Sequence, residues 1–363
     1  MSRPGRVQIA RAACFELLGR VFANPDAIKQ EMLRRDCSSW IEDLDEPGRV
    51  WAEHALAESY KPPRQRASLM HPPTPSAPDR ERIDVLLVTV VPNEAEAAEI
   101  VFDLGRDHPG ARRREDGRRY HEASLETHRA GRLNLVLTNI GESGNTTAQG
   151  ALRSMLRLYE PELVLLAGIA AGRLDSVKLG DLVLPRKVWY LEKGASLPDE
   201  FRREAQERRL PQRLYTLVGE HRIRRTGFYE QLQEALTQLD DDQLPPGVKR
   251  THKPGFDSDA SVVASEKLLR DGSLRKLASA EGVDRKIKLG DMESWGLVQA
   301  VGSGSVGEWT GDNPPEWMVV RAVSDFGEVD KDDNWQMFAS VCALVGARHF
   351  LQVTYERRKD AVL

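Results

Sequence analysis

The sequence is poor in cysteine, has no long apolar run and carries little net charge, and each of these features excludes a class of protein. Its three cysteines, Cys14, Cys37 and Cys342, are too few and too far apart for a disulfide framework or a zinc cluster. A formal net charge of −4 gives no whole-chain basis for binding nucleic acid. No apolar run approaches the ~20 residues that cross a bilayer, and no apolar signal segment follows the N-terminus. We therefore expect a cytoplasmic protein that binds neither membrane nor nucleic acid.

The clearest division of the chain is a proline-rich segment at residues 61–82, whose composition favours an extended linker. Before it, residues 1–60 carry apolar side chains at helical spacing, for example between Ala10 and Val21, and predict a small all-α module. A module of about 60 residues buries only a marginal core. We expect it to dock a partner or to regulate, and we assign the chemistry to residues 83–363.

Strands and helices alternate after the linker. The run from Val85 to Val91 is continuously apolar, as in a strand that is buried on both faces. The further elements are expected as a hairpin at residues 120–127 and 133–138, a helix at 146–159 ended by Pro161, a strand at 163–167 and a last helix at 335–355 with one core-facing stripe. This order predicts a mixed α/β sheet flanked by helices.

Three carboxylates stand at the ends of apolar runs. Glu94 follows the strand 85–91, Glu293 follows Lys288–Met292, and Asp325 follows the run 317–323. Strand ends of this kind meet at one rim of an α/β sheet, where ligands bind. Apolar neighbours such as Met292, Trp295 and Phe326 would raise the pKa of such a carboxyl and fit it for acid or base catalysis near neutral pH.

Two glycine-rich turns accompany the carboxylates. GESGNTTA, residues 141–148, contains Gly144 and Asn145, and its backbone N–H groups are suited to an anion or to sugar hydroxyls. GIAAG, residues 168–172, begins with Gly168 and Ile169 and allows close approach to the backbone. Neither turn is a Walker loop or a GxGxxG fingerprint, and a plain tight turn explains each of them equally well.

Taken in order, VVPNEAEA, SGN, LLAGIAAG, GDLVLP, ASEKLLRD, GDMES and VVRAVSD resemble the nucleoside phosphorylase and nucleosidase superfamily, nearest to its 5′-methylthioadenosine/S-adenosylhomocysteine nucleosidase branch. The resemblance covers about residues 83–355. It implies a mixed, partly barrel-like sheet flanked by helices, and cleavage of an N-ribosidic bond without metal or cofactor.

The resemblance also implies roles for individual residues. Glu94 matches the glutamate that positions the attacking water, and Asp325 matches the acid that protonates the purine at N7, with Ser324 supporting it. Glu293 matches the ligand of the ribose hydroxyls, and Met292 the apolar contact beneath the sugar. Gly144, Asn145, Gly168 and Ile169 are the remaining candidates for substrate binding.

The chain departs from the family pattern in two places. Phosphorylases hold phosphate with arginines near the ribose, whereas residues 141–148 contain no arginine and include Glu142, so hydrolysis is favoured over phosphorolysis. The family's Ser-Gly-Asp and base-stacking aromatic are replaced at residues 265–269 by Ser-Glu-Lys-Leu-Leu, which leaves the base open. A phosphorylase remains an alternative, and so does a non-catalytic nucleotide-sensing module.

A charged insertion at residues 193–250 has no counterpart in a minimal nucleosidase. It is read either as a solvated helical excursion or as a clamp in which Arg222, Arg224 and Arg225 bind the 5′-phosphates of a nucleotide. A helical module ahead of such an enzyme resembles bacterial defence effectors, in which the module receives an upstream protein. We expect a purine nucleoside or nucleotide as substrate and a homodimer or higher homo-oligomer.

Overall fold

The computed structural model describes residues 81–105, 109–113, 117–196, 201–221, 223, 227–266, 274, 284–302, 314–327 and 333–358. The chain divides into two units, Met1–Ala77 and Pro78–Leu363, and all the described residues belong to the second. The expected helical module, most of the expected linker, and Arg222, Arg224 and Arg225 lie outside the described residues. The expected domain boundaries therefore stay predictions.

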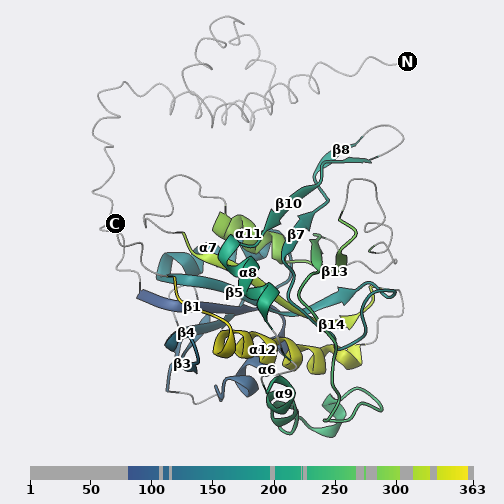
Figure 1. Cartoon of the computed structure of the whole chain (residues 1–363). Coiled ribbons are helices and arrows are strands. Elements are labelled where there is room, and N and C mark those ends of the chain that lie inside the picture. The colour runs from purple at the N-terminus through teal and green to yellow at the C-terminus, as the bar shows by residue number, and fades with distance from the viewer. Residues whose placement is uncertain are drawn as a thin grey trace, which may run out of the picture. The chain divides into compact units, whose positions relative to one another are not determined.

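The centre of the fold is the long strand β5 (Tyr159–Gly172), which lies between two parallel neighbours (Figure 1). Strand β1 (Glu81–Thr89) pairs with its first half, and β14 (Glu316–Asp325) pairs along it from Leu163 onward. The continuous apolar runs of β1, β5 and β14 are buried on both faces because helices cover the sheet on each side.

The other strands extend the sheet from this centre, in the order β10-β7-β12-β13-β5-β1-β4-β3-β2. On one side lie β4 (Gly131–Asn139), β3 (Arg119–Thr127) and β2 (Ala111–Arg113); on the other lie β13 (Ile287–Asp291), β12 (Ser261–Ala264), β7 (Lys187–Tyr190) and β10 (Gln206–Arg209). The sheet forks at β14, which also pairs β6 (Leu182–Val183), itself paired with β11 (Phe256–Asp257). This mixed, forked sheet confirms the expected fold class.

Helices cover both faces of the sheet (Figure 1). One face carries α12 (Gln336–Val353), with α6 (Pro92–Val101) and α9 (Phe228–Leu236) beside it. The other carries α7 (Asn145–Leu158) and α11 (Ser294–Gly302), which pack on each other. The remaining elements are α8 (Gln212–Glu220), the 3-10 turns η3 (Asp241–Gln243) and η4 (Asp333–Trp335), and the hairpin of β8 (Gly194–Ser196) and β9 (Phe201–Arg203).

The expected helix at 146–159 ends at Leu158, ahead of Pro161, and Pro161 itself pairs with Ile83 near the start of β5. Two expectations need correction. Helix α12 is buried almost all round rather than along one stripe, because α6, α9 and the sheet enclose it. The insertion 193–250 is not a solvated helical excursion throughout, since it includes short strands and the core-facing helix α9.

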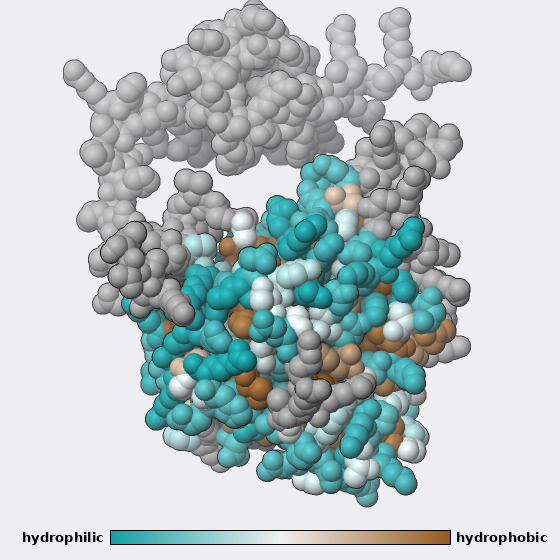
Figure 2. All heavy atoms as spheres, in the orientation of Figure 1, coloured by the Kyte–Doolittle hydropathy of each residue, from teal (hydrophilic) through white to brown (hydrophobic). Residues whose placement is uncertain are grey.

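The face of the molecule seen in Figure 2 is mostly hydrophilic, with scattered hydrophobic residues. Among the described residues, Leu174 is the exposed large hydrophobic side chain. No helix in the described part of the chain combines the length and apolarity that a membrane crossing requires.

Candidate active site

A break in the pairing of β5 creates the site. Strand β1 pairs with β5 as far as Leu166, and β13 pairs with β5 only at Ala171 and Gly172. In the interval, the N–H of Ile169 donates to Glu94 Oε1 at 2.8 Å instead of to a strand. The site therefore lies where β5 changes neighbours, as expected for a ligand site in an α/β sheet.

Glu94 is held in this interval by the start of α6. Pro92 at the first helical position fixes the entry of the helix and puts Glu94 in its first turn. The Glu94 carboxylate reaches back to accept the N–H groups of Val90 at 2.6 Å and Val91 at 3.1 Å. This is half of a capping box, because Val91 has no side-chain acceptor to return. Both carboxylate oxygens are thus engaged by backbone donors.

Gly168 makes room for that carboxylate. A Cβ at Gly168 would overlap the Glu94 side chain, so only glycine fits opposite it. The resemblance suggests substrate contact for Gly168, whereas the geometry gives it a packing role beneath the catalytic candidate.

Arg321 joins the carboxylates into one buried cluster. It lies on β14 with 0% of its surface exposed. Its Nε donates to Asp291 Oδ2 at 2.9 Å and its Nη2 to Glu293 Oε2 at 3.1 Å. Its Nη1 lies 3.8 Å from Glu94 Oε1 and has no hydrogen-bond partner among the described residues. Three carboxylates therefore face a single guanidinium.

This excess of negative charge controls the protonation of the cluster. Burial raises the pKa of Glu293 to about 7, with the neighbouring carboxylates adding to the rise and Arg321 opposing it. Burial also raises the pKa of Glu94, against the opposing effect of Arg321 and of the three backbone N–H donors. Both groups are thereby placed to exchange protons closer to neutral pH than free glutamates.

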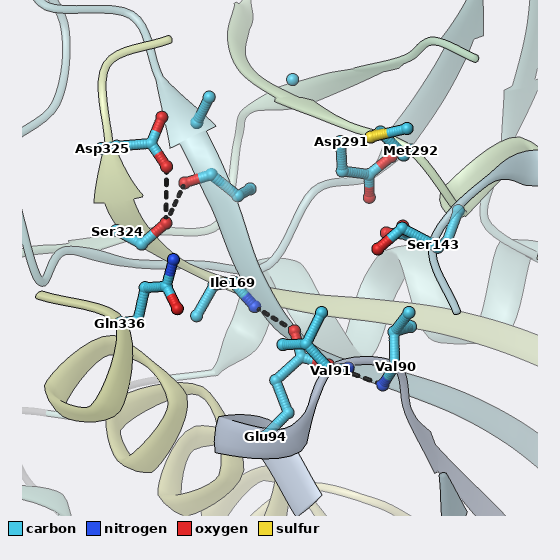
Figure 3. A pocket seen from close by; sticks show the side chains of 14 residues that line it. Val90, Val91, Glu94, Ser143, Ile169, Asp291, Met292, Ser324, Asp325 and Gln336 are labelled. Atoms are coloured by element: carbon cyan, nitrogen blue, oxygen red, sulfur yellow. Dashed lines mark hydrogen bonds between the residues drawn. The ribbon is translucent and has the colours of Figure 1, made fainter. Parts of the chain in front are cut away.

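Asp325 stands across the cavity from Asp291 (Figure 3). Its Oδ1 accepts the N–H of Gly327 at 2.8 Å, and the Ser324 hydroxyl lies 3.0 Å from Oδ2 and 3.5 Å from the carbonyl of Ala170. These contacts fix the orientation of the Asp325 carboxyl. Met292 lies on the opposite wall beside Asp291.

The cavity between these walls measures about 140 Å³. Whole drug-sized ligands occupy pockets of ~300–1,000 Å³, so this space suits the sugar portion of a larger molecule. Six of the predicted residues line it: Glu94, Ile169, Met292, Glu293, Ser324 and Asp325. The structure therefore brings these six predicted residues together around one cavity.

Gly144 and Asn145 lie behind the wall rather than in it. The N–H of Gly144 is 3.4 Å from Glu293 Oε1. The Asn145 side chain donates to the carbonyl of Ser265 at 3.1 Å and accepts the N–H of Gly296 at 3.0 Å. Both the nitrogen and the oxygen of this amide are therefore hydrogen-bonded within the protein. The Asn145 side chain links the residue that follows β12 to α11, and so it supports the site without lining it.

Sequence reasoning missed Arg321 and Asp291. Both lie inside motifs that carry the resemblance, VVRAVSD and GDMES. The available signal was an arginine in the middle of an otherwise apolar strand, because a buried cation requires partners. Residues 141–148 contain no arginine, as expected, and the arginine that contacts Asp291 and Glu293 comes from β14 instead.

Solved structures of known proteins share this fold. The 5′-methylthioadenosine/S-adenosylhomocysteine nucleosidase of Neisseria meningitidis superimposes with a TM-score of 0.50 at 13% identity, over 74% of this chain and 99% of that one. The S-adenosylhomocysteine nucleosidase of Streptococcus pyogenes gives 0.51 at 12% identity, over 75% and 97%. The chain has the nucleosidase fold. No protein-family model matches it.

The chain is also similar in sequence to a curated protein. ATP nucleosidase Cap17 of Escherichia coli is 27% identical over 274 residues, which are 74% of this chain and 51% of the relative. The chain thus spans about half the length of the curated relative that it matches.

Proposed function

We propose that this chain hydrolyses the N-ribosidic bond of a purine nucleoside or nucleotide. The observation that carries the proposal is the arrangement of Glu94, Glu293 and Asp325 around one cavity on a nucleosidase fold. Cleavage through an oxocarbenium-like state needs a proton for the leaving base, negative charge near the sugar and an activated water. The three carboxylates supply one requirement each.

The acid and the base are separated by the cavity. Asp325 protonates the departing base from one side, while Glu94 takes a proton from water at the floor. The free Nη1 of Arg321 points toward Glu94 and donates to the same water, since 3.8 Å is a distance that a bridging water suits. Glu293 binds the ribose hydroxyls and stabilises the positive charge on the sugar.

The electrostatics of the site favour water over phosphate. No lysine or arginine is among the described residues that line the cavity. The nearby Arg321 already has its Nε and Nη2 bound by Asp291 and Glu293. A phosphate dianion would face Glu94, Asp291 and Glu293, with Nη1 of Arg321 as the remaining cationic donor against the repulsion of three carboxylates. A phosphorylase is therefore the weaker alternative.

Hydrolysis is tested by identifying the products of adenosine, guanosine, methylthioadenosine, ATP, dATP and GTP with and without phosphate. In heavy-oxygen water, hydrolysis places the heavy oxygen on C1 of the released sugar. A phosphate requirement, with sugar 1-phosphate as product, would establish the phosphorylase instead. Tight nucleotide binding with no turnover would support the non-catalytic sensor.

ATP is the first nucleotide to test, because the curated relative is named for that activity. We propose Arg222, Arg224 and Arg225 as the contacts of its 5′-phosphates. Replacing all three with alanine is expected to raise KM for ATP strongly and to leave adenosine unchanged, at ~1.5–3 kcal/mol per charged hydrogen bond. Arg129→Ala, which breaks an exposed pair with Glu356, is the control. Equal effects on ATP and adenosine would remove these arginines from phosphate binding.

We further propose that residues 1–60 receive an upstream protein in a defence system and that the enzyme works as a homo-oligomer. Deleting residues 1–60 is expected to leave turnover intact and to abolish dependence on that upstream protein. Light scattering of the full chain reports the oligomeric state. Loss of turnover on truncation would place the N-terminal residues in the catalytic unit instead.

A further inference from the structure

A second cavity lies away from the active site, between helices α6, α9 and α12, which lie side by side (Figure 1). It measures about 290 Å³, roughly twice the catalytic cavity. Helix α9 belongs to the insertion that the proposed reaction does not otherwise use. The floor combines the buried Val101, Ala235 and Val345 with the half-buried Arg348 and Gln231.

Arg348 has unused hydrogen-bonding capacity in this cavity. Its Nη1 donates to the carbonyl of Val101 at 2.8 Å and so satisfies the C-terminal end of α6. That helix-capping role leaves Nε, which is buried and has no partner among the described residues. No described carboxylate lies within ion-pair distance of Arg348. Because the half-buried Arg348 lines the cavity and no described carboxylate neutralises it, its guanidinium is suited to bind an anionic oxygen.

Gln231 has an acceptor oxygen without a hydrogen-bond donor among the described residues. Its Nε2 donates to Gln352 Oε1 at 3.1 Å, while its Oε1 is buried without a partner among the described residues. Two exposed carboxylates, Asp103 and Glu234, also belong to the wall, and neither forms an ion pair within the described chain. The cavity therefore offers acceptors for a cationic or N–H donor near the donors of Arg348.

We propose that this cavity binds a small aliphatic zwitterion, a molecule with a carboxylate, an ammonium and a short apolar side chain. The carboxylate pairs with the Arg348 guanidinium, the ammonium pairs with Asp103 and Glu234 on the rim, and the side chain lies on Val101 and Val345. A purely anionic ligand such as a nucleotide is disfavoured because Asp103 and Glu234 would repel it.

The proposal is tested by calorimetric titration of the full-length protein with three related probes. L-Leucine carries both charges, 4-methylpentanoate lacks the ammonium, and 3-methylbutylamine lacks the carboxylate. Leucine is expected to bind. The affinity of each of the other two probes should be lower by about tenfold or more, since each loses a charged hydrogen bond. The readout does not involve turnover, so its failure is distinguishable from failure of the proposed hydrolysis.

Variants separate the two ends of the probe. Arg348→Met keeps an unbranched apolar stem but removes the guanidinium, and it is expected to weaken the binding of leucine and 4-methylpentanoate by about tenfold or more. Glu234→Gln, on the exposed rim, is expected to weaken leucine but not 4-methylpentanoate. Arg357→Met, which breaks a pair with Asp84 outside the cavity, is the matched control and should leave all three unchanged.

Three results would overturn the proposal. Absence of leucine binding would leave the cavity to solvent. Equal affinity for leucine and 4-methylpentanoate would remove the ammonium subsite, and binding of inorganic phosphate in preference to leucine would make it an anion site. If Arg348→Met fails to fold, the Glu234→Gln comparison decides the matter by itself.

Discussion

A Cβ on Gly168 would lie 1.9 Å from Glu94 Oε1. The two residues come from different elements, β5 and α6, and the absence of one side chain is the condition for the placement of the other. The position of the Glu94 carboxylate in the cavity thus depends on Gly168, a residue without a side chain.

Gly168→Ala is expected to abolish turnover, because the added methyl must displace the Glu94 carboxylate or separate α6 from β5. A fall in the melting temperature should accompany the loss, since the Ile169 and Val90 bonds to Glu94 cannot all survive. Gly150→Ala is the control: Gly150 lies in α7 with open space around it, and alanine there should be neutral or slightly stabilising. Normal turnover in Gly168→Ala would show that Glu94 is not confined as described.

Glu94→Gln should eliminate turnover while ligand binding persists, because an amide cannot take a proton from water. It should also cost about 1–3 kcal/mol of stability, since both Glu94 oxygens accept backbone N–H groups and the amide nitrogen must face one of these donors. Glu96→Gln, exposed on the same helix, is the control and should change neither quantity. Wild-type turnover in Glu94→Gln would exclude the proposed base.

Asp325→Asn is expected to lower turnover by about 10² to 10⁴ without unfolding the protein. The amide keeps the contacts described for the carboxylate with Gly327 and Ser324, because its oxygen still accepts from the Gly327 N–H and its nitrogen can donate to Ser324 Oγ. Ser324→Ala should have a smaller effect, since it removes only the support. Steady-state rates with circular dichroism distinguish these cases, and activity within a few fold of wild type would remove Asp325 from the mechanism.

The pH dependence of stability should report on Glu293. Its folded-state pKa of about 7 lies above the ordinary value of 4.5, so the folded state binds this proton more tightly than the unfolded state. The stabilisation is full below pH 4.5 and is lost as the pH rises toward 7, on the order of 3 kcal/mol. Glu293→Gln should flatten this part of the denaturant-midpoint profile, whereas an unchanged slope would assign the titration to another group.

The sequence predicts those parts of the site that are encoded next to one another along the chain. Glu94 and Asp325 are found because each follows an apolar strand, and Met292 because it precedes Glu293 within one motif. Arg321 is missed because its meaning depends on its partners, and these come from α6 and from the end of β13.

Asn145 is a residue whose local sequence suggested a ligand contact that distant residues make instead. It stands in a turn that suits ligand binding, and nothing nearby in sequence reveals that Ser265 and Gly296 use its amide. The insertion is different, since Phe228, Leu232 and Leu236 recur at four-residue spacing and are buried. That spacing was available from the sequence but was outweighed by the charges around it.

The bond between the Ile169 N–H and Glu94 Oε1 gives the molecule a spectroscopic reporter. An amide proton that donates to a carboxylate moves in chemical shift when the carboxylate gains a proton. Because Ile169 lies in the interval of β5 that is paired with neither β1 nor β13, its shift should follow Glu94 with little contribution from those strands. A nitrogen-15 label at Ile169 would make the ionisation of the Glu94 carboxyl visible in solution, with no substrate present.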